Sequence, residues 1–84
     1  MEAYTDKVYN VTMYTVANCE FCEMAKNLLY SHKDYVIYEV DLTSKPSVKQ
    51  NVKEKLGTTV PQIVIDGVHI GGYKELQEYF DQWK

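Results

Sequence analysis

The stretch Asn18–Leu29, NCEFCEMAKNLL, places the only two cysteines of the 84-residue chain three positions apart. Two different periodicities meet at this point. Before the cysteines, residues 8–15 alternate apolar and polar positions and are rich in β-branched and aromatic side chains, which is typical of a strand. From Glu20 to about His32 the apolar residues recur with helical spacing. The sequence therefore predicts a strand–turn–helix unit with Cys19 at the helix cap and Cys22 in the first helical turn.

The middle of the chain repeats this alternation of strand and helix. Residues 35–41, YVIYEVD, predict a second strand. The segment that follows predicts a second helix, with Ser44 as its N-cap, Pro46 in its first turn and Gly57 at its end. Its apolar stripe consists of Val48, Val52 and Leu56. Two strand–helix units in succession predict parallel pairing of the first two strands.

The last third of the chain changes to a hairpin and a closing helix. Two short apolar runs in residues 61–72 are joined by Asp66-Gly67, a strong indicator of a two-residue hairpin turn. The closing segment places Leu76, Phe80 and Trp83 on one helical face. The predicted order is β-α-β-α-β-β-α, an α/β fold. We expect a four-stranded mixed sheet with helices on both faces, because right-handed crossovers place helices on the faces of a sheet.

Composition limits the classes of function. With 45% hydrophobic and 25% charged residues, we expect residues 1–84 to form a single globular domain. The net charge of −3 and the nine dispersed basic residues argue against nucleic-acid binding. The sequence has neither an apolar signal-peptide region nor an 18-residue apolar run, so we expect no membrane association and a cytoplasmic location. In that reducing setting a cysteine pair is more often catalytic or metal-binding than structural.

The spacing of the cysteines suits reversible oxidation. Helix geometry places residues i and i+3 about 5 Å apart at Cα, inside the disulfide window of roughly 4.4 to 6.8 Å. A four-residue loop gains only about 2 kcal/mol from such a bridge, so a purely structural bridge is the weaker interpretation. Unpaired N–H groups and the helix dipole favour a thiolate at the cap. We therefore expect Cys19 to be the attacking sulfur and Cys22 the resolving one.

A zinc site is the competing interpretation of the same cysteines. Four-coordinate zinc would need Cys19, Cys22, His32 and His69 together. Thirteen residues of helix put His32 roughly 20 Å along the axis from Cys19, and the spacing of the two histidines matches no zinc finger. We therefore expect no metal site.

Three segments together resemble a known family. The segments YTVANCEFC (residues 14–22) and TTVPQIVIDGVHIGG (residues 58–72), with the closing helix, resemble a dithiol glutaredoxin over nearly the whole chain. The resemblance implies a thioredoxin fold, a cis peptide between Val60 and Pro61 that faces the cysteines, and glutathione as the reductant. Independently, Pro61 cannot donate a hydrogen bond to a neighbouring strand, so it leaves an edge that an extended peptide can use.

The resemblance also implies roles for six residues around the cysteines. Thr59, Val60 and Pro61 would hold the cysteinyl backbone of glutathione in a strand-like pairing. Phe21 would flank it, and Gly72 with Tyr73 would receive its γ-glutamyl end. Two other tyrosines, Tyr14 and Tyr38, are expected to pack in or beside the sheet.

Three positions depart from the family pattern. Glu20 stands where the family usually has proline, Val16 stands where it usually has lysine, and Lys74-Glu75 replaces a small or acidic pair. A carboxylate about 8 Å from a thiolate raises the thiolate's energy by roughly 0.5 to 1 kcal/mol at an effective dielectric of 40 to 80. We therefore expect Cys19 to favour the thiolate less than in a proline-bearing relative.

These observations predict a thiol–disulfide oxidoreductase that acts as a monomer on protein or glutathione mixed disulfides. The resemblance implies glutathione as co-substrate. The disulfide substrate stays open between ribonucleotide reductase, a peroxidase and a glutathionylated protein. Two alternatives stay open. A flavoenzyme reductase would recycle the protein in the first, and in the second Cys19 and glutathione would hold an iron–sulfur cluster between two chains.

Overall fold

A computed structural model describes residues 7–82. Its seven elements follow the predicted order: β1 (Tyr9–Thr15), α1 (Glu20–Tyr30), β2 (Tyr35–Asp41), α2 (Pro46–Lys55), β3 (Gln62–Ile65), β4 (Val68–Gly71) and α3 (Tyr73–Asp81). Trp83, predicted on the closing helix, lies outside the described residues. Within residues 7–82, every helix is too short or too polar to traverse a bilayer.

The four strands form one mixed sheet in the order β2-β1-β3-β4. Strands β1 and β2 run parallel, whereas β3 is antiparallel to both β1 and β4. The predicted hairpin turn has positive φ at both central residues, 49° at Asp66 and 82° at Gly67, which is the pattern of a type I′ turn. Asp66 Oδ1 also accepts a hydrogen bond of 2.9 Å from the backbone N–H of Asn10. The turn therefore joins β3 to β4 and is tied to β1.

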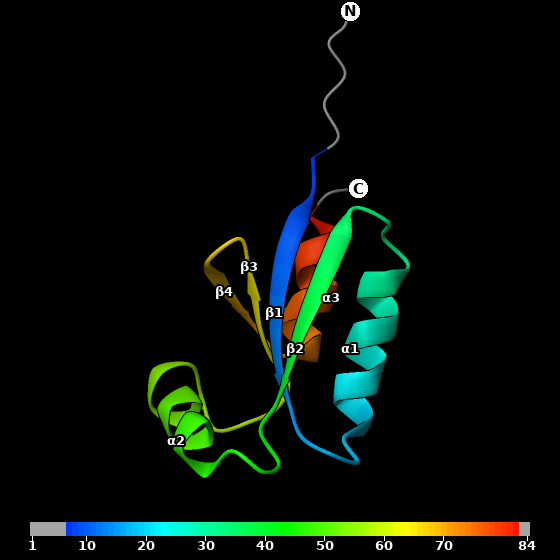
Figure 1. The fold of residues 1–84 in the computed structure, drawn as a ribbon. Coiled ribbons are helices and arrows are strands. Elements are labelled where there is room, and N and C mark those ends of the chain that lie inside the picture. The colour runs from blue at the N-terminus through cyan, green and yellow to red at the C-terminus, as the bar shows by residue number, and fades with distance from the viewer. Residues whose placement is uncertain (1–6, 83–84) are drawn as a thin grey trace, which may run out of the picture.

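The main hydrophobic core lies between the sheet and two helices. Figure 1 shows α1 and α3 together on one side of the sheet and α2 on the other, near the end of β1. Alternate residues of β1 and β3 point toward α1 and α3, as the period of two requires. The buried cluster comprises Val11, Met13, Ala25, Leu29, Ile63, Ile65 and Leu76. The predicted two-faced arrangement of helices is confirmed, with the larger core beneath α1 and α3.

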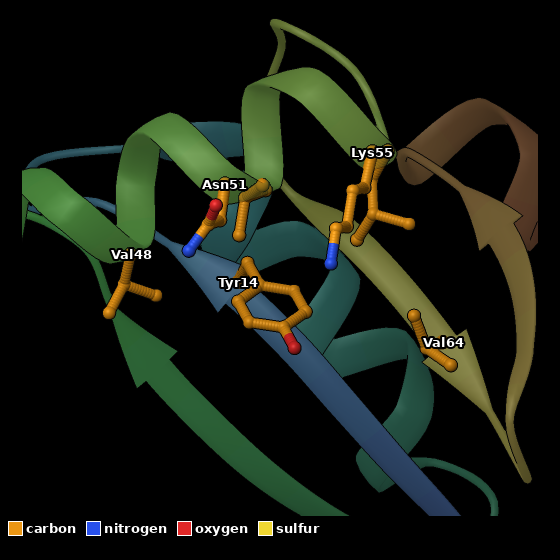
Figure 2. A pocket seen from close by; sticks show the side chains of 7 residues that line it. Tyr14, Val48, Asn51, Lys55 and Val64 are labelled. Atoms are coloured by element: carbon orange, nitrogen blue, oxygen red, sulfur yellow. The ribbon is translucent and has the colours of Figure 1, made fainter.

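Helix α2 covers only part of its face. Val52 is buried, but a cleft of about 300 Å³ remains between α2 and strands β1 and β3 (Figure 2). Tyr14 and Val64 lie on the sheet side of this cleft, opposite Val48, Asn51 and Lys55 of α2. Tyr14 is therefore half-buried beside the sheet, as expected. The expectation that Tyr38 packs against the sheet is wrong: this residue is 58% exposed, because α2 does not reach across β2.

Two predicted helix ends are wrong by one or two residues. The N-cap of α2 is Lys45, not Ser44, and its side chain makes no capping hydrogen bond. The N–H of Lys45 donates to the carbonyl of Leu42. Ser44 therefore lies inside a turn that precedes the helix, rather than at its N-cap. Helix α1 ends at Tyr30 rather than His32, because the Ser31 hydroxyl donates to the Leu28 carbonyl and the N–H of His32 bonds Leu29, three residues back, instead of Leu28.

Candidate active site

The two cysteines lie in the turn from β1 to α1. Asn18 has a left-handed φ of 57°, which asparagine tolerates better than most residues, and it turns the chain into the helix. Cys19 is the N-cap of α1, and the backbone N–H of Cys22 donates a hydrogen bond of 3.2 Å to its Sγ. The predicted cap position of Cys19 is confirmed.

The structure holds the two cysteines in a disulfide bond, with their Cα atoms 5.2 Å apart. This Cα separation lies within the range that disulfides normally require. Cys22 is only 1% exposed, whereas Cys19 is half-buried and reaches the surface. An incoming thiolate or disulfide therefore has access to the sulfur of Cys19 and not to that of Cys22.

The carboxylates beside Cys19 have different environments. Glu20, Glu23, Asn18 and Cys19 line a surface depression of about 500 Å³. Glu23 Oε2 forms an ion pair of 2.9 Å with Lys26 Nζ, but among residues 7–82 Glu20 has no ion-pair partner. Glu20 is therefore the less compensated of the two charges near the sulfur.

Lys26 connects the first turn of α1 to the sheet. Its Nζ lies 3.2 Å from Oε1 of Glu39 on β2, and Glu39 Oε2 accepts a hydrogen bond of 2.7 Å from the buried hydroxyl of Thr15. The hydrogen bond to Glu23, followed by the one to Glu39, raises the pKa of Lys26. These contacts fix the start of α1 against the ends of β1 and β2, and so help to hold the cysteine turn.

A groove lies next to the cysteine turn, between α1, the loop that precedes β3, and α3. It has a volume of about 520 Å³ and is lined by all six residues predicted for glutathione: Phe21, Thr59, Val60, Pro61, Gly72 and Tyr73. Lys74, Glu75 and Gln77 complete the lining. The ring centroids of Phe21 and Tyr73 are 6.1 Å apart, and Phe21 is 56% exposed. The groove thus joins the helical turn that holds the cysteines to the start of α3.

The peptide bond between Val60 and Pro61 is cis, as the resemblance implied. Pro61 is fully buried, whereas Val60 and Thr59 remain accessible in the wall of the groove. The structure thus brings together the three segments that carried the resemblance. The binding role of their residues stays a prediction.

The start of α3 is held by Glu75. Its Oε1 accepts a hydrogen bond of 2.9 Å from the N–H of Gly72, and this bond is the main reason that the pKa of Glu75 is lowered. Gly71, at φ 123°, adopts a conformation that side chains rarely take, and a Cβ there would lie 2.9 Å from Cγ of Glu75. Glu75 therefore caps the helix with its carboxylate, and Lys74 supplies a cation in the groove wall.

Asn18 and Gln77 are site residues that the sequence did not predict. Asn18 directly precedes the helix cap, a position that favours residues able to adopt positive φ. Gln77 lies one turn after Tyr73 and donates a hydrogen bond of 3.2 Å to its hydroxyl. Residues four apart on a helix lie on the same face, so the spacing of Gln77 from Tyr73 could have indicated that Gln77 belongs to the site.

The two histidines lie away from the cysteines. The ring of His32 stacks on Phe80 with centroids 3.8 Å apart, and His69 Nε2 lies 2.7 Å from Oε1 of Gln62. Throughout the described range 7–82, no three histidine, cysteine or acidic side chains converge as metal ligands. The four residues considered for zinc therefore do not form a common site.

Comparisons with known proteins agree with this geometry. The Glutaredoxin family model matches residues 11–70. Glutaredoxin 1 of Rickettsia prowazekii is 40% identical over 73 residues, which cover 82% of this chain and 75% of the relative. Glutaredoxin 3 of Escherichia coli K12 is 40% identical over 68 residues, 80% of this chain and 81% of the relative.

A solved structure shows the same fold. The solution structure of glutaredoxin from Brucella melitensis is 32% identical, with a TM-score of 0.76, and the match covers 95% of this chain and 86% of that one. The predicted thioredoxin fold is thereby confirmed. The family match, the relatives at 40% identity and the Cys19–Cys22 pair at the head of α1 show that this chain belongs to the glutaredoxin family of thiol–disulfide oxidoreductases.

Proposed function

We propose that this glutaredoxin reduces protein and glutathione mixed disulfides and is itself reduced by glutathione. The single observation that carries the proposal is the groove lined by Phe21, Thr59, Val60, Pro61, Gly72 and Tyr73. Its volume of about 520 Å³ falls within the range of roughly 300 to 1,000 Å³ that is usual for small-molecule sites. A buckwheat glutaredoxin of similar fold, 20% identical with a TM-score of 0.74, was crystallised as a glutathione complex.

The chemistry of the groove walls fits a peptide with charged ends. Phe21 and Tyr73 offer aromatic faces, Val60 offers backbone groups, and Lys74 adds a cation that can meet a carboxylate. Glutathione has two carboxylates, one amino group and a peptide backbone. Its backbone can therefore pair with Val60, and one of its carboxylates can pair with Lys74.

For a glutathione mixed disulfide, the thiolate of Cys19 attacks the glutathione sulfur and the substrate thiolate leaves. The new Cys19–glutathione disulfide is then attacked by a second glutathione thiolate, which forms glutathione disulfide and restores the Cys19 thiolate. One disulfide is consumed and one is formed: the glutathione disulfide joins the glutathione carried by the substrate to one free glutathione, which supplies the reducing thiol.

For a protein disulfide, Cys19 first forms a mixed disulfide with one substrate sulfur. The thiolate of Cys22 then attacks Sγ of Cys19, the substrate leaves as a dithiol, and the Cys19–Cys22 disulfide remains. The short Cα separation of 5.2 Å means that this closure needs little backbone movement. Two glutathione molecules reopen the bridge.

The test measures formation of glutathione disulfide during turnover of a glutathionylated peptide and, separately, of a protein with one internal disulfide. We expect turnover with millimolar glutathione alone. Phe21→Ala and Tyr73→Ala should raise KM for the glutathionylated peptide, and Tyr30→Ala, at an exposed position on the far end of α1, is the matched control. Reduction by a flavoenzyme reductase with NADPH, but not by glutathione, would contradict the proposal.

An absorption spectrum of protein purified without oxygen tests the iron–sulfur alternative. Visible charge-transfer bands that disappear on removal of glutathione would favour the cluster-binding function. The proposed function predicts only the ultraviolet absorption of its aromatic residues.

A further inference from the structure

Gln62 is a buried polar side chain that connects β4 to the loop before Pro61. The residue is only 4% exposed. Its Nε2 donates a hydrogen bond of 2.8 Å to the backbone carbonyl of Thr59 and lies 3.3 Å from the Thr59 hydroxyl. Its Oε1 lies 2.7 Å from Nε2 of His69. Each polar atom of the amide thus has a partner, as buried polar groups require.

The partners determine the direction of these hydrogen bonds. A backbone carbonyl can only accept, so the amide nitrogen of Gln62 must face Thr59 and its oxygen must face His69. His69 Nε2 must then carry the proton and donate it to Oε1. Donors therefore run in one direction, from His69 through Gln62 to the carbonyl of Thr59.

This arrangement controls which way the backbone of the groove wall faces. The only cis peptide among residues 7–82 is Val60–Pro61, so the Thr59–Val60 peptide is trans and its C=O and N–H point in opposite directions. Holding the Thr59 carbonyl toward Gln62 therefore turns the N–H of Val60 away from Gln62. Within the described part of the chain, Val60 makes no backbone hydrogen bond of its own. Its N–H is thus available to a ligand in the groove.

The backbone at Gly57, before Thr59, passes close to the side-chain amide of Gln62. Gly57 has a φ of 148°, and a Cβ at this position would lie 2.9 Å from Gln62 Nε2. A side chain at this position would have to displace the end of the Gln62 side chain, and L residues rarely adopt such a φ, so glycine suits both the backbone and the contact. The loop that begins at Gly57 is therefore built around Gln62 rather than merely adjacent to it.

We propose that Gln62 and His69 are positioning residues for the disulfide substrate: they hold the Thr59 carbonyl so that the backbone of Val60 faces the groove. Neither side chain lines the groove. They act through Thr59 and Val60, and the inference rests on the proposed use of the groove by glutathione.

The experiment compares Gln62→Met, which keeps the length of the side chain and removes its hydrogen bonds, with His69→Phe, which removes the donor. KM and kcat are measured with a glutathionylated peptide. The rate of Cys19 alkylation by iodoacetamide is measured on the same reduced proteins, because this reagent does not need the groove. Val68→Ala, at a 62% exposed position next to His69, is the matched control.

Losing the hydrogen bonds that hold the Thr59 carbonyl should raise KM by roughly 5- to 20-fold in Gln62→Met, with kcat and the alkylation rate within about twofold of the parent. His69→Phe should give a smaller rise. His69→Gln should restore the parent KM, because its Nε2 is separated from Cβ by the same number of bonds and can donate to Gln62. Val68→Ala should match the parent in all three quantities.

Three results overturn the positioning role. The first is a parent KM in a folded Gln62→Met protein. The second is a parallel loss of kcat, alkylation rate and thermal stability, which indicates a general structural effect. The third, independent of how Gln62→Met folds, is an unchanged KM in His69→Phe. If the parent protein does not turn over the glutathionylated peptide, the proposed function itself fails.

Discussion

The backbone N–H of Cys22 donates a hydrogen bond to Sγ of Cys19 across 3.2 Å. This bond makes the two cysteines unequal, because the Cys19 sulfur at the helix cap accepts the hydrogen bond and the buried sulfur of Cys22 in the first turn does not. In the reduced protein the same N–H is placed to stabilise a thiolate on Cys19.

The first prediction follows from this inequality. Cys19→Ser should abolish turnover of both substrate classes, whereas Cys22→Ser should keep turnover of glutathionylated peptides and lose reduction of internal protein disulfides. The two assays described above measure this difference. An equal loss in both variants would show that the cap position does not select the attacking sulfur.

A second prediction concerns the carboxylate that replaces the family proline. Glu20→Gln should lower the pKa of Cys19, because it removes roughly 0.5 to 1 kcal/mol of repulsion from the thiolate. The couple should become more oxidising, since a stabilised thiolate favours the reduced form. Thiolate absorbance against pH and equilibration with a glutathione buffer measure the two quantities.

Glu23→Gln is the matched control for Glu20. Lys26 lies 2.9 Å from Glu23 and compensates its charge, so the shift in the Cys19 pKa should be smaller. If Glu20→Gln changes neither the pKa nor the redox potential, the carboxylate is screened by solvent and does not tune the thiol.

A third prediction concerns the cap of α3. The pKa of Glu75 is lowered below its usual 4.5 in the folded state, first by the N–H of Gly72. An ionised Glu75 therefore stabilises the fold above that pH, and its contribution is lost as pH falls through the lowered pKa. Glu75→Gln should have a lower Tm than the parent at pH 7 and nearly the same Tm at about pH 3.

Glu78→Gln, on the same helix, is the control for this pH dependence. Its side chain is exposed and does not cap the helix N-terminus, so its effect on Tm should be small at both pH values. A gap between Glu75→Gln and the parent that persists at acid pH would mean that the cap does not depend on the charge.

The fourth prediction tests the larger core. Leu76 is fully buried between α3 and the sheet, and Leu76→Ala should reduce the free energy of unfolding by about 2 to 5 kcal/mol. Val48→Ala, beside the cleft under α2, should cost less, because its side chain is already 37% exposed. Denaturant unfolding measures both, and equal losses would contradict the division into a tight core and a loose one.

Local physical chemistry made much of this protein predictable from its sequence. Alternation in β1, helical spacing in α1 and the Asp66-Gly67 turn each depend on neighbours within a few residues, and all three appear as predicted. The same holds for Cys19 and Cys22, because a spacing of three residues at a helix start already determines that they can form a bridge. The predicted N-cap at Ser44 was wrong because the chain forms a separate turn before the helix. In this turn the N–H of Thr43 bonds Asp41 Oδ1 and the N–H of Lys45 bonds the carbonyl of Leu42.

Only the tertiary structure decided what surrounds the cysteines. No local pattern shows that Lys26 pairs with Glu23 and Glu39 together, since β2 must first lie beside α1. The hydrogen-bond partners of Gln62 could not be predicted either. Alternation in a strand assigns a side chain to one face of the sheet, but it does not show that Gln62 bonds Thr59 and His69. The sequence thus determined the elements and the reactive pair, because both follow from short-range geometry. Packing of distant segments determined which charges and hydrogen bonds act on that pair and on the groove beside it.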